Sequence, residues 1–345
     1  MAAPVRVGEP LAQFTTFRVG GPAARLLEVG DAERLIDEVR SCDREGEPVL
    51  VLAGGSNLLI SDAGFGGTVL RVGLRGITAA GDEDAVRVRV GAGEPWDEFV
   101  AWAVAEGLIG IEALSGIPGS AGATPIQNVG AYGQEVASVV AAVHVWDRLL
   151  GSSYSLGAEH CGFSYRDSLF KRTGRFVVTA VEFRLRRARL GCPVAYAELA
   201  RALDVTVGES APAAAVREAV LGLRRSKGMV LDAADHDTWS AGSFFTNPVL
   251  SVAAAAELPE KAPRYDAPGG TIKTSAAWLI ENAGFAKGHG SGPARLSTKH
   301  TLALTNRGSA TATDLVELAR EIRAGVEAKF GIRLEPEPVL VGLTL

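Results

Sequence analysis

The stretch from Ser115 to Gly133 constrains the fold more than any other part of this sequence. Five of its nineteen residues are glycine, two are proline, and small hydroxyl residues stand between them. Such a composition cannot continue a helix or a central strand, so a long loop must connect the regular elements here. Loops of this length inside a domain are often functional, although a purely structural Ω-loop has a similar composition.

Short apolar segments and amphipathic helices alternate along the rest of the chain, which predicts an α+β fold. At 345 residues the chain exceeds the usual size of one hydrophobic core. We therefore expect three regions, with approximate boundaries near residues 75 and 229. The patterns predict helices over 31–44, 95–106, 212–225, 276–282 and 313–330, and strands over 49–52, 86–90, 143–146, 176–185, 301–305 and 339–343.

Composition excludes several classes of protein. The net charge is −5 and the arginines are scattered, which argues against nucleic acid or an anionic membrane as a partner. The N-terminus lacks the apolar segment of a signal peptide, and no apolar run approaches the roughly 20 residues that span a bilayer, so we expect a cytoplasmic protein. Cys42, Cys161 and Cys192 lack metal-ligand spacing, which predicts buried free thiols and no metal site.

Several common catalytic motifs are also missing from the sequence. No GxGxxG follows a strand, and GxxxxGK[ST], HExxH and GxSxG do not occur. These absences weigh against Rossmann, P-loop and zinc-hydrolase interpretations.

A second loop of small residues, Gly54-Gly55-Ser56-Asn57-Leu58, follows directly after the apolar segment 49–52. Two glycines let the backbone approach a ligand closely, and the Ser and Asn side chains add hydrogen bonds, as in an anion-binding nest. An ordinary tight turn uses the same residues. The longer loop adds the amides Gln127 and Asn128, which could supply neutral donors to the phosphates of a dinucleotide.

Together the two loops resemble the FAD-binding half of the UDP-N-acetylenolpyruvoylglucosamine reductases. The resemblance continues in family order through most of the chain, in the segments 163–171 (FSYRDSLFK), 241–248 (AGSFFTNP), 277–280 (AWLI) and 334–337 (LEPE). Each segment alone is modestly specific, and their joint occurrence is highly specific.

The resemblance implies an α+β, two-domain FAD-binding unit of the vanillyl-alcohol-oxidase/PCMH-like type plus a third α+β substrate domain. The implied division is 1–75 with a C-terminal strand in 331–345, then 76–229, then 230–330. It further implies that NADPH reduces UDP-N-acetylenolpyruvoylglucosamine to UDP-N-acetylmuramate through FAD, during peptidoglycan precursor synthesis. A flavin oxidase of small hydroxylated substrates on the same fold, or a non-catalytic flavin-binding module, remains an alternative.

By the same resemblance, both loops contribute to the cofactor site. The implied FAD-binding residues are Gly54, Gly55, Ser56, Asn57, Leu58, Pro118, Gly119, Ser120, Gly122, Thr124, Gln127, Asn128, Gly130, Ala131 and Tyr132.

Three residues match the family's catalytic positions. Ser243 matches the proton donor to the substrate carbon, and Arg166 and Glu337 match the pair that stabilises the enolic intermediate. Arginine offers a two-pronged donor to a carboxylate, and a protonated carboxyl could donate to the same charge. Without the resemblance, Ser243 would be interpreted as a turn residue and Arg166 as part of a surface ion pair. Glu335 would lie on the same face of a strand as Glu337, so only the motif favours Glu337.

Five further residues match substrate contacts, and Tyr196 matches the mobile tyrosine of one subgroup. They are Tyr165, Tyr196, Lys227, Asn247 and His300. The alternative for Tyr196 is a half-buried packing residue, and His300 could equally be an ordinary core or surface group. Thr15 and Thr246 depart from the family pattern, in which many relatives carry Asn and Lys, so neither receives a role.

Overall fold

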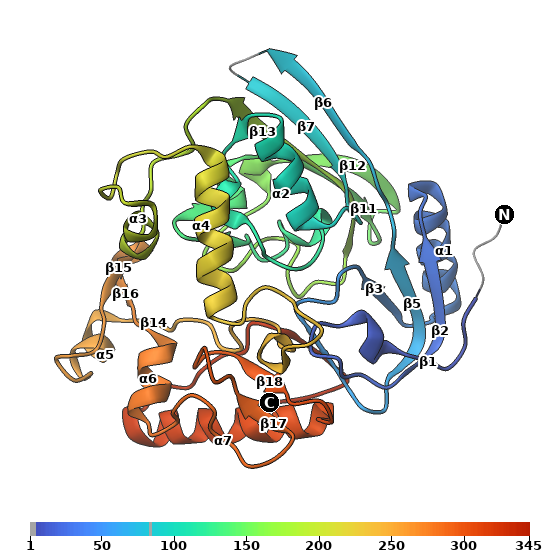
Figure 1. Cartoon of the computed structure of the whole chain (residues 1–345). Coiled ribbons are helices and arrows are strands. Elements are labelled where there is room, and N and C mark those ends of the chain that lie inside the picture. Colours follow the sequence, from blue (N-terminus) through green and yellow to red (C-terminus); the bar gives the residue numbers. More distant parts are fainter. Residues whose placement is uncertain (1–4, 83–84) are drawn as a thin grey trace. The chain divides into compact units, whose positions relative to one another are not determined.

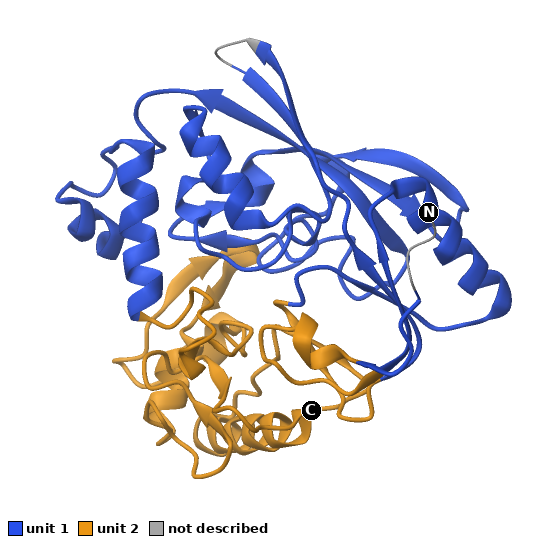
Figure 2. Cartoon of the chain, turned by 45° about the vertical axis from the view of Figure 1, so that its right-hand side comes forward, with its two compact units in different colours: residues 1–9, 23–55, 65–226 blue, residues 10–22, 56–64, 227–345 orange. Residues whose placement is uncertain are grey.

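The protein is described here by a computed structural model that covers residues 5–82 and 85–345. It divides into two compact units, each built from separate stretches of chain (Figure 2). Unit 1 contains 1–9, 23–55 and 65–226, and unit 2 contains 10–22, 56–64 and 227–345. The three-domain division expected from the sequence is a finer one and remains a prediction.

Unit 1 begins with a small sheet in the order β1-β2-β5-β3. Both β2 (Pro22–Val29) and β3 (Val49–Leu52) pair in parallel with β5 (Phe65–Val72), and β1 (Glu9–Pro10) lies at the edge. The connection between β2 and β3 is α1 (Ala32–Glu45), which packs Leu35 and Val39 into the core. Asp31 caps the start of α1 by accepting from the Arg34 amide, and the left-handed Gly46 ends it.

The larger sheet of unit 1 is antiparallel, in the order β12-β11-β13-β7-β6. Its strands are β6 (Ile77–Asp82), β7 (Ala85–Gly91), β11 (Val140–Asp147), β12 (Ser152–Gly157) and the long β13 (Phe176–Arg187), whose end also pairs with β8 (Leu108–Ile109). Against this sheet packs α2 (Trp96–Ala105), with the Trp96 and Phe99 rings 5.7 and 5.2 Å from the Phe183 ring.

Two further helices complete unit 1, α3 (Ala197–Leu203) and α4 (Ala213–Ser226). They share a small core that includes Val194, Leu199 and Val220, and α4 also packs against α2 (Figure 1). Between β8 and β11 the chain forms only the 3-10 turns η2 (Glu112–Leu114), η3 (Ala121–Ala123) and η4 (Val136–Ser138) and the short strands β9 (Gly130–Ala131) and β10 (Gln134–Glu135). The irregular loop expected here is confirmed.

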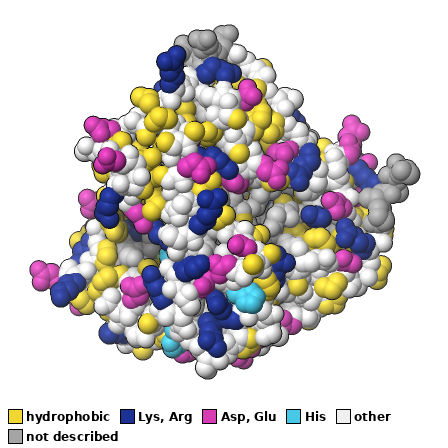
Figure 3. Space-filling view, in the orientation of Figure 1, with side chains coloured by type: hydrophobic (Ala, Val, Ile, Leu, Met, Phe, Trp, Pro, Cys, Tyr) yellow, Lys and Arg dark blue, Asp and Glu magenta, His cyan; other side chains and the backbone are white. Residues whose placement is uncertain are grey.

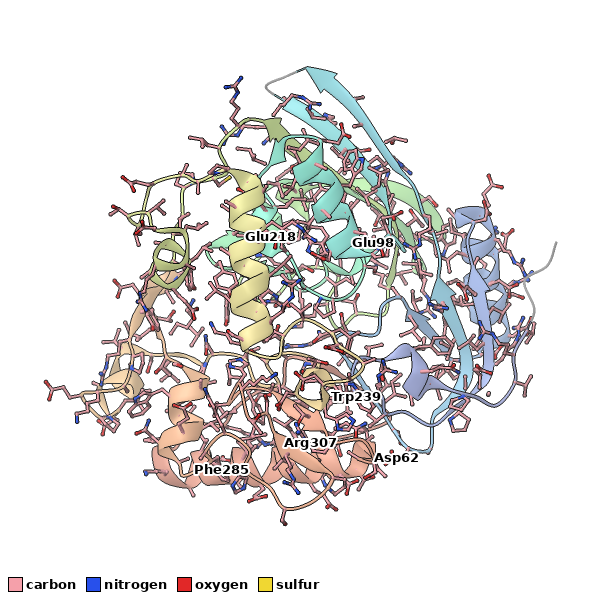
Figure 4. The ribbon with its side chains drawn as sticks, viewed as in Figure 1. Asp62, Glu98, Glu218, Trp239, Phe285 and Arg307 are labelled. Carbon is pink, nitrogen blue, oxygen red and sulfur yellow. The ribbon has the colours of Figure 1, made fainter. Side chains whose placement is uncertain are left out.

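Unit 2 is built around α7 (Ala312–Phe330), with α6 (Ala276–Asn282) against it. Thr311 and Asp314 form a capping box, and Asp62 (Figure 4) accepts from the amides of Ala312 and Thr313. Short antiparallel sheets join β14 (Val249–Leu250), β15 (Tyr265–Ala267) and β16 (Thr271–Lys273), and separately β17 (Ala294–Leu296) and β18 (Leu304–Asn306). The short α5 (Val252–Ala256) follows β14.

The last strand of the chain, β19 (Val339–Val341), pairs in parallel with β4 (Leu58–Ile60). This pairing joins the C-terminal strand to a segment early in the sequence.

The helices predicted from the sequence are confirmed with small shifts at their ends. The predicted strand 301–305 begins only at Leu304, because the Ala303 amide turns back to the His300 carbonyl. Cys42 and Cys161 are free and buried, but the prediction of burial is wrong for Cys192, which lies half-buried in a loop where its amide bonds to Glu112. On the face shown in Figure 3, basic and acidic side chains are interspersed.

Within residues 5–82 and 85–345, no helix is both long and apolar enough to cross a membrane. The same residues contain no group of three His, Cys, Asp or Glu side chains arranged to hold a metal ion.

Candidate functional site

The two glycine-rich loops meet in unit 1. A Cβ atom on Gly54 would lie 2.6 Å from the Cα atom of Gly119, closer than real Cβ contacts allow. Gly55 has a φ of +57°, which favours glycine on steric grounds. Glycine is therefore required after β3 because the backbone here lies close to the second loop. An ordinary tight turn would not require this contact.

The hydroxyl groups of the long loop divide into two kinds. Thr124 donates to the Ala121 carbonyl at 2.8 Å, so its hydroxyl supports the turn η3. Ser120 is buried, yet its Oγ has no hydrogen-bond partner among the described residues. A buried hydroxyl without a partner is costly, so Ser120 is the group that a bound ligand would satisfy.

Asn128, expected to bind the cofactor, directs its side chain into the protein. Its Nδ2 donates to Glu135 Oε2 at 2.9 Å and to the Ser164 carbonyl at 3.0 Å, and its Oδ1 accepts from the Ala137 amide. Packing also explains Gly122, because a Cβ there would lie 2.5 Å from the Ala92 Cβ. Both residues shape the loop, and any contact that they make with FAD would come from the backbone.

Arg166 lies against the end of the same loop. Its guanidinium donates to the Gly130 carbonyl at 2.7 Å and to the Asn128 carbonyl at 3.4 Å, and lies 5.4 Å from the Tyr165 ring centre. Tyr132, from the loop, and Tyr196, at the start of α3, are in edge contact with ring centres 6.3 Å apart. Burial raises the pKa of Tyr132. Unit 1 thus gathers Arg166 and three tyrosines around the loop.

Tyr196 is 53% exposed, which argues against its reading as a packing residue. It stands directly before α3, and its neighbour Ala195 lies so close to Gly133 that a Cβ on that glycine would be 2.6 Å from the Ala195 Cβ.

The other two predicted catalytic residues lie in unit 2, on neighbouring segments. Ser243 is half-buried and precedes the buried Phe244 and Phe245. The Glu337 amide donates to the Phe244 carbonyl at 2.8 Å, and Phe245 and Pro336 form an antiparallel bridge. These bonds place the segment of Ser243 directly beside that of Glu337.

The structure separates the surroundings of Glu337 from those of Glu335, which periodicity could not do. Glu337 is half-buried and its carbonyl accepts from the Asn57 side chain at 3.4 Å, whereas Glu335 is exposed and uses its carbonyl to hold Thr246. The position of Glu337 beside Asn57 and the Ser243 segment supports the motif's choice.

The remaining predicted substrate contacts also lie in unit 2. The Asn247 Oδ1 accepts from the Ala276 amide at 2.9 Å at the start of α6, which leaves Nδ2 as its possible contact with a substrate. Lys227 directly follows α4, and His300 is half-buried in the turn before β18. Near that turn, Thr298 and Arg307 (Figure 4) both donate to the buried Asp237.

Among the buried charged residues of unit 1 that received no role from the sequence are Glu112, Lys171 and Arg224. Glu112 is fully buried and accepts from the amides of Gly110 and Cys192. Lys171 donates to the Arg166 carbonyl at 2.6 Å. Burial lowers the pKa of Arg224 to about 10, so its charge remains at neutral pH. Only Arg224 carried a signal, since it follows the buried Val216 and Val220 at helical spacing.

The geometry of the loops fits FAD. The backbones of the two loops approach each other closely at Gly54 and Gly119, and the buried Ser120 hydroxyl has no partner among the described residues; both features suit close contact with a dinucleotide. The residues that would hold FAD are therefore the backbone of both loops together with Ser120.

Comparisons with known proteins agree with this geometry. Residues 23–152 match the FAD binding domain, and residues 233–341 match the C-terminal domain of UDP-N-acetylenolpyruvoylglucosamine reductase. The predicted α+β class with an FAD-binding unit is confirmed.

Full-length relatives extend the match. The UDP-N-acetylenolpyruvoylglucosamine reductase of Thermobifida fusca is 56% identical over 97% of this chain and 98% of its own. That of Salinispora arenicola is 58% identical over 97% of this chain and 95% of its own. The crystal structure of the reductase from Thermus caldophilus superposes with a TM-score of 0.66 at 27% identity, covering 99% of both chains. With such identity over nearly its whole length, the chain belongs to the UDP-N-acetylenolpyruvoylglucosamine reductase family.

Proposed function

We propose that this protein reduces UDP-N-acetylenolpyruvoylglucosamine to UDP-N-acetylmuramate with FAD as cofactor and NADPH as electron donor. The observation that carries the proposal is that, within unit 2 of a chain from this family, the segment of Ser243 is hydrogen-bonded to that of Glu337. The reaction belongs to peptidoglycan precursor synthesis, which links the protein to cell-wall growth, cell shape and division. The proposed location is the cytoplasm.

When bound, FAD would take hydride from NADPH and deliver it to the enolpyruvyl double bond. The protein's own residues manage charge and protons. Ser243 would protonate the substrate carbon next to the one that receives hydride. A serine hydroxyl is a weak acid, so the step requires a strongly basic carbon and a nearly linear approach.

Arg166 and Glu337 would stabilise the charge that builds on the substrate carboxylate. The guanidinium has five N–H donors, so Arg166 can hold the carbonyls of Asn128 and Gly130 and still reach a carboxylate. Glu337, in its protonated form, would donate a second hydrogen bond to the enolic oxygen. This division of roles is supported by the motif and by the half-buried position of Glu337.

The uridine nucleotide would be held by Tyr165, Tyr196, Lys227, Asn247 and His300. Lys227 suits a pyrophosphate because its ammonium is a compact point charge. Tyr196 is exposed, and it would order over the nucleotide when substrate binds.

Purified protein provides the test. We expect a yellow protein whose colour is released by acid, because no Cys or His lies in either loop to tether the flavin. NADPH oxidation should then depend on added UDP-N-acetylenolpyruvoylglucosamine and yield UDP-N-acetylmuramate by mass spectrometry. NADPH or hydroxylated-substrate oxidation by oxygen alone would instead indicate a flavin oxidase, and a yellow protein inert to both would indicate a binding module.

A further inference from the structure

The turn that presents Arg166 has an unfavourable backbone. Residues Ser164 to Asp167 form a tight turn, closed by the Asp167 amide donating to the Ser164 carbonyl at 3.3 Å and by the Ser164 amide donating to the Asp167 carbonyl at 3.1 Å. Arg166 occupies its third position with a φ of +53°. Glycine is preferred there, since a side chain is strained at positive φ. Something outside the turn must hold Arg166 in this conformation.

Lys171 bonds directly to the backbone of Arg166. The side chain is buried, at 7% exposure, and its Nζ donates to the Arg166 carbonyl at 2.6 Å. Lysine is rarely buried unless its charge is paired or hydrogen-bonded. A short, charge-assisted bond to one particular carbonyl therefore fixes the peptide that follows Arg166.

The same segment is attached to the cofactor loop at both ends. Asn128 Nδ2 donates to the Ser164 carbonyl before Arg166, and the buried Ser168 donates to the Ile126 carbonyl at 2.6 Å after it. These bonds fix the ends of the turn, and between them the Lys171 ammonium donates to the carbonyl of Arg166 itself. The backbone that carries the guanidinium is thus bonded on both sides and at its own carbonyl.

We propose that Lys171 is a positioning residue for the reaction, which holds Arg166 in its left-handed conformation and so aims the guanidinium at the substrate carboxylate. The inference rests on the proposed function for its catalytic consequence, but its structural part can be measured separately. A lysine that merely stabilised the fold would slow every step or none, and would act independently of the Arg166 side chain.

The test compares Lys171→Met with wild type by stopped flow and by hydrogen exchange. Flavin bleaching by NADPH should proceed near the wild-type rate, while reoxidation by UDP-N-acetylenolpyruvoylglucosamine should slow by about 10- to 100-fold, since small misplacements of a catalytic group have effects of this size. The Asp167 amide should exchange faster as its turn loosens. Lys171→Arg, which keeps a charged donor, should recover part of both losses.

Two further variants separate positioning from stability. Adding Lys171→Met to Arg166→Met should slow reoxidation no further than Arg166→Met alone, because the two residues act as one unit. Lys329→Met removes another lysine-to-carbonyl bond, to Asn282 on the surface of unit 2, and should leave both half-reactions unchanged. Should Lys171→Met fail to fold, Lys171→Gln, which removes the charge but keeps a donor, should show the same two losses to a smaller extent.

Equal slowing of both half-reactions, additive losses in the double variant, or unchanged exchange at Asp167 would overturn the positioning role. A wild-type protein that ignores the sugar nucleotide would instead overturn the proposed function, and the exchange measurement would still decide whether Lys171 fixes the turn.

Discussion

Arg166 in unit 1 and Ser243 in unit 2 are held by opposite physical means. Arg166 sits on a strained turn fixed by polar bonds, one of them from a buried ammonium. Ser243 precedes two fully buried phenylalanines, whose ring centres lie 5.0 Å apart, and Phe17 adds an edge contact to Phe244 at 6.4 Å. Arg166 is thus positioned by hydrogen bonds, and Ser243 by the packing of apolar side chains next to it.

The difference shows how the support of each residue can be broken. A polar support fails when one donor is lost, with little change in apolar burial, so its loss should appear in rates. An apolar support fails when volume is removed, and its loss should appear first in the free energy of unfolding. Variants in the two units should therefore give different signatures.

The largest expected effect comes from Ser243→Ala, which removes the proton donor and leaves the aromatic support intact. Reoxidation by the sugar nucleotide should slow by roughly 10²- to 10⁴-fold, or about 3 to 5 kcal/mol of barrier. Flavin bleaching by NADPH needs no proton from Ser243 and should stay near the wild-type rate. Stopped-flow absorbance measures both phases.

Ser243→Cys serves as the matched control, since it restores an acidic proton with a small change of geometry, and it should regain part of the rate. Reoxidation of Ser243→Ala at the wild-type rate would assign the proton to another residue.

Phe245→Ala removes the packing behind Ser243. Because Phe245 is 1% exposed, the truncation should lower the free energy of unfolding by about 3 to 5 kcal/mol, as measured by urea denaturation. Val252→Ala, at an exposed position of α5, is the control and should change stability little. A small loss in Phe245→Ala would mean that the aromatic cluster does not support this segment.

Gly54→Ala tests the backbone approach on the cofactor side. The added Cβ would meet Gly119 at 2.6 Å, and such overpacking typically costs about 1 to 3 kcal/mol. The cost should appear as weaker FAD binding, measured by titrating apoprotein with FAD. Gly46→Ala is the control, because its Cβ would meet nothing within 4 Å. It imposes the strain of a positive φ without a clash and should bind FAD normally. Equally weakened FAD binding in both variants would show that the contact between Gly54 and Gly119 does not matter for the cofactor.

The smallest effect concerns acid stability in unit 1. Hydrogen bonds from Arg175, with Nη2 2.6 Å from Oδ2, hold the pKa of the buried Asp147 well below its ordinary 3.8. A lowered folded-state pKa contributes stability that is present above pH 3.8 and lost as the pH falls below it.

Asp147→Asn should therefore be less stable than wild type at neutral pH, and the difference between the two should shrink on acidification below about pH 4. Thermal unfolding midpoints across this range measure the trend. A constant difference at all pH values would show that charge at Asp147 does not contribute.

The sequence predicted those parts of the fold that local chemistry decides. Leu35 and Val39 mark the buried face of α1, and Asp31 and Gly46 mark its ends, so the helix could be recognised from its own residues. The close contact of Gly54 with Gly119 could not be recognised in this way. A glycine in the sequence indicates a backbone that can adopt unusual conformations or approach another segment closely, but it does not identify that segment.

The candidate site follows the same division. Its residues came from motifs, yet nothing local reveals that Arg166 has a positive φ or that Lys171 is buried beneath it. Asn128 shows the converse. Its residue type suggested a contact with a ligand, whereas in the structure its side-chain amide is hydrogen-bonded to Glu135, Ser164 and Ala137. Tertiary contacts decide which polar atoms remain for a ligand.

The pairing of β4 with β19 has a consequence for how the protein is made. Asn57 and Glu337, which flank this pairing, are 280 residues apart. At 5–20 residues per second, a ribosome needs about 14 to 56 s to connect them. During that interval unit 1 can be completed by residue 226, but the early segments of unit 2 wait as unfinished nascent chain. Chains stalled before Val339 should therefore expose β4 to proteases, and β4 should become protected once the last residues leave the ribosome and β19 can pair with it.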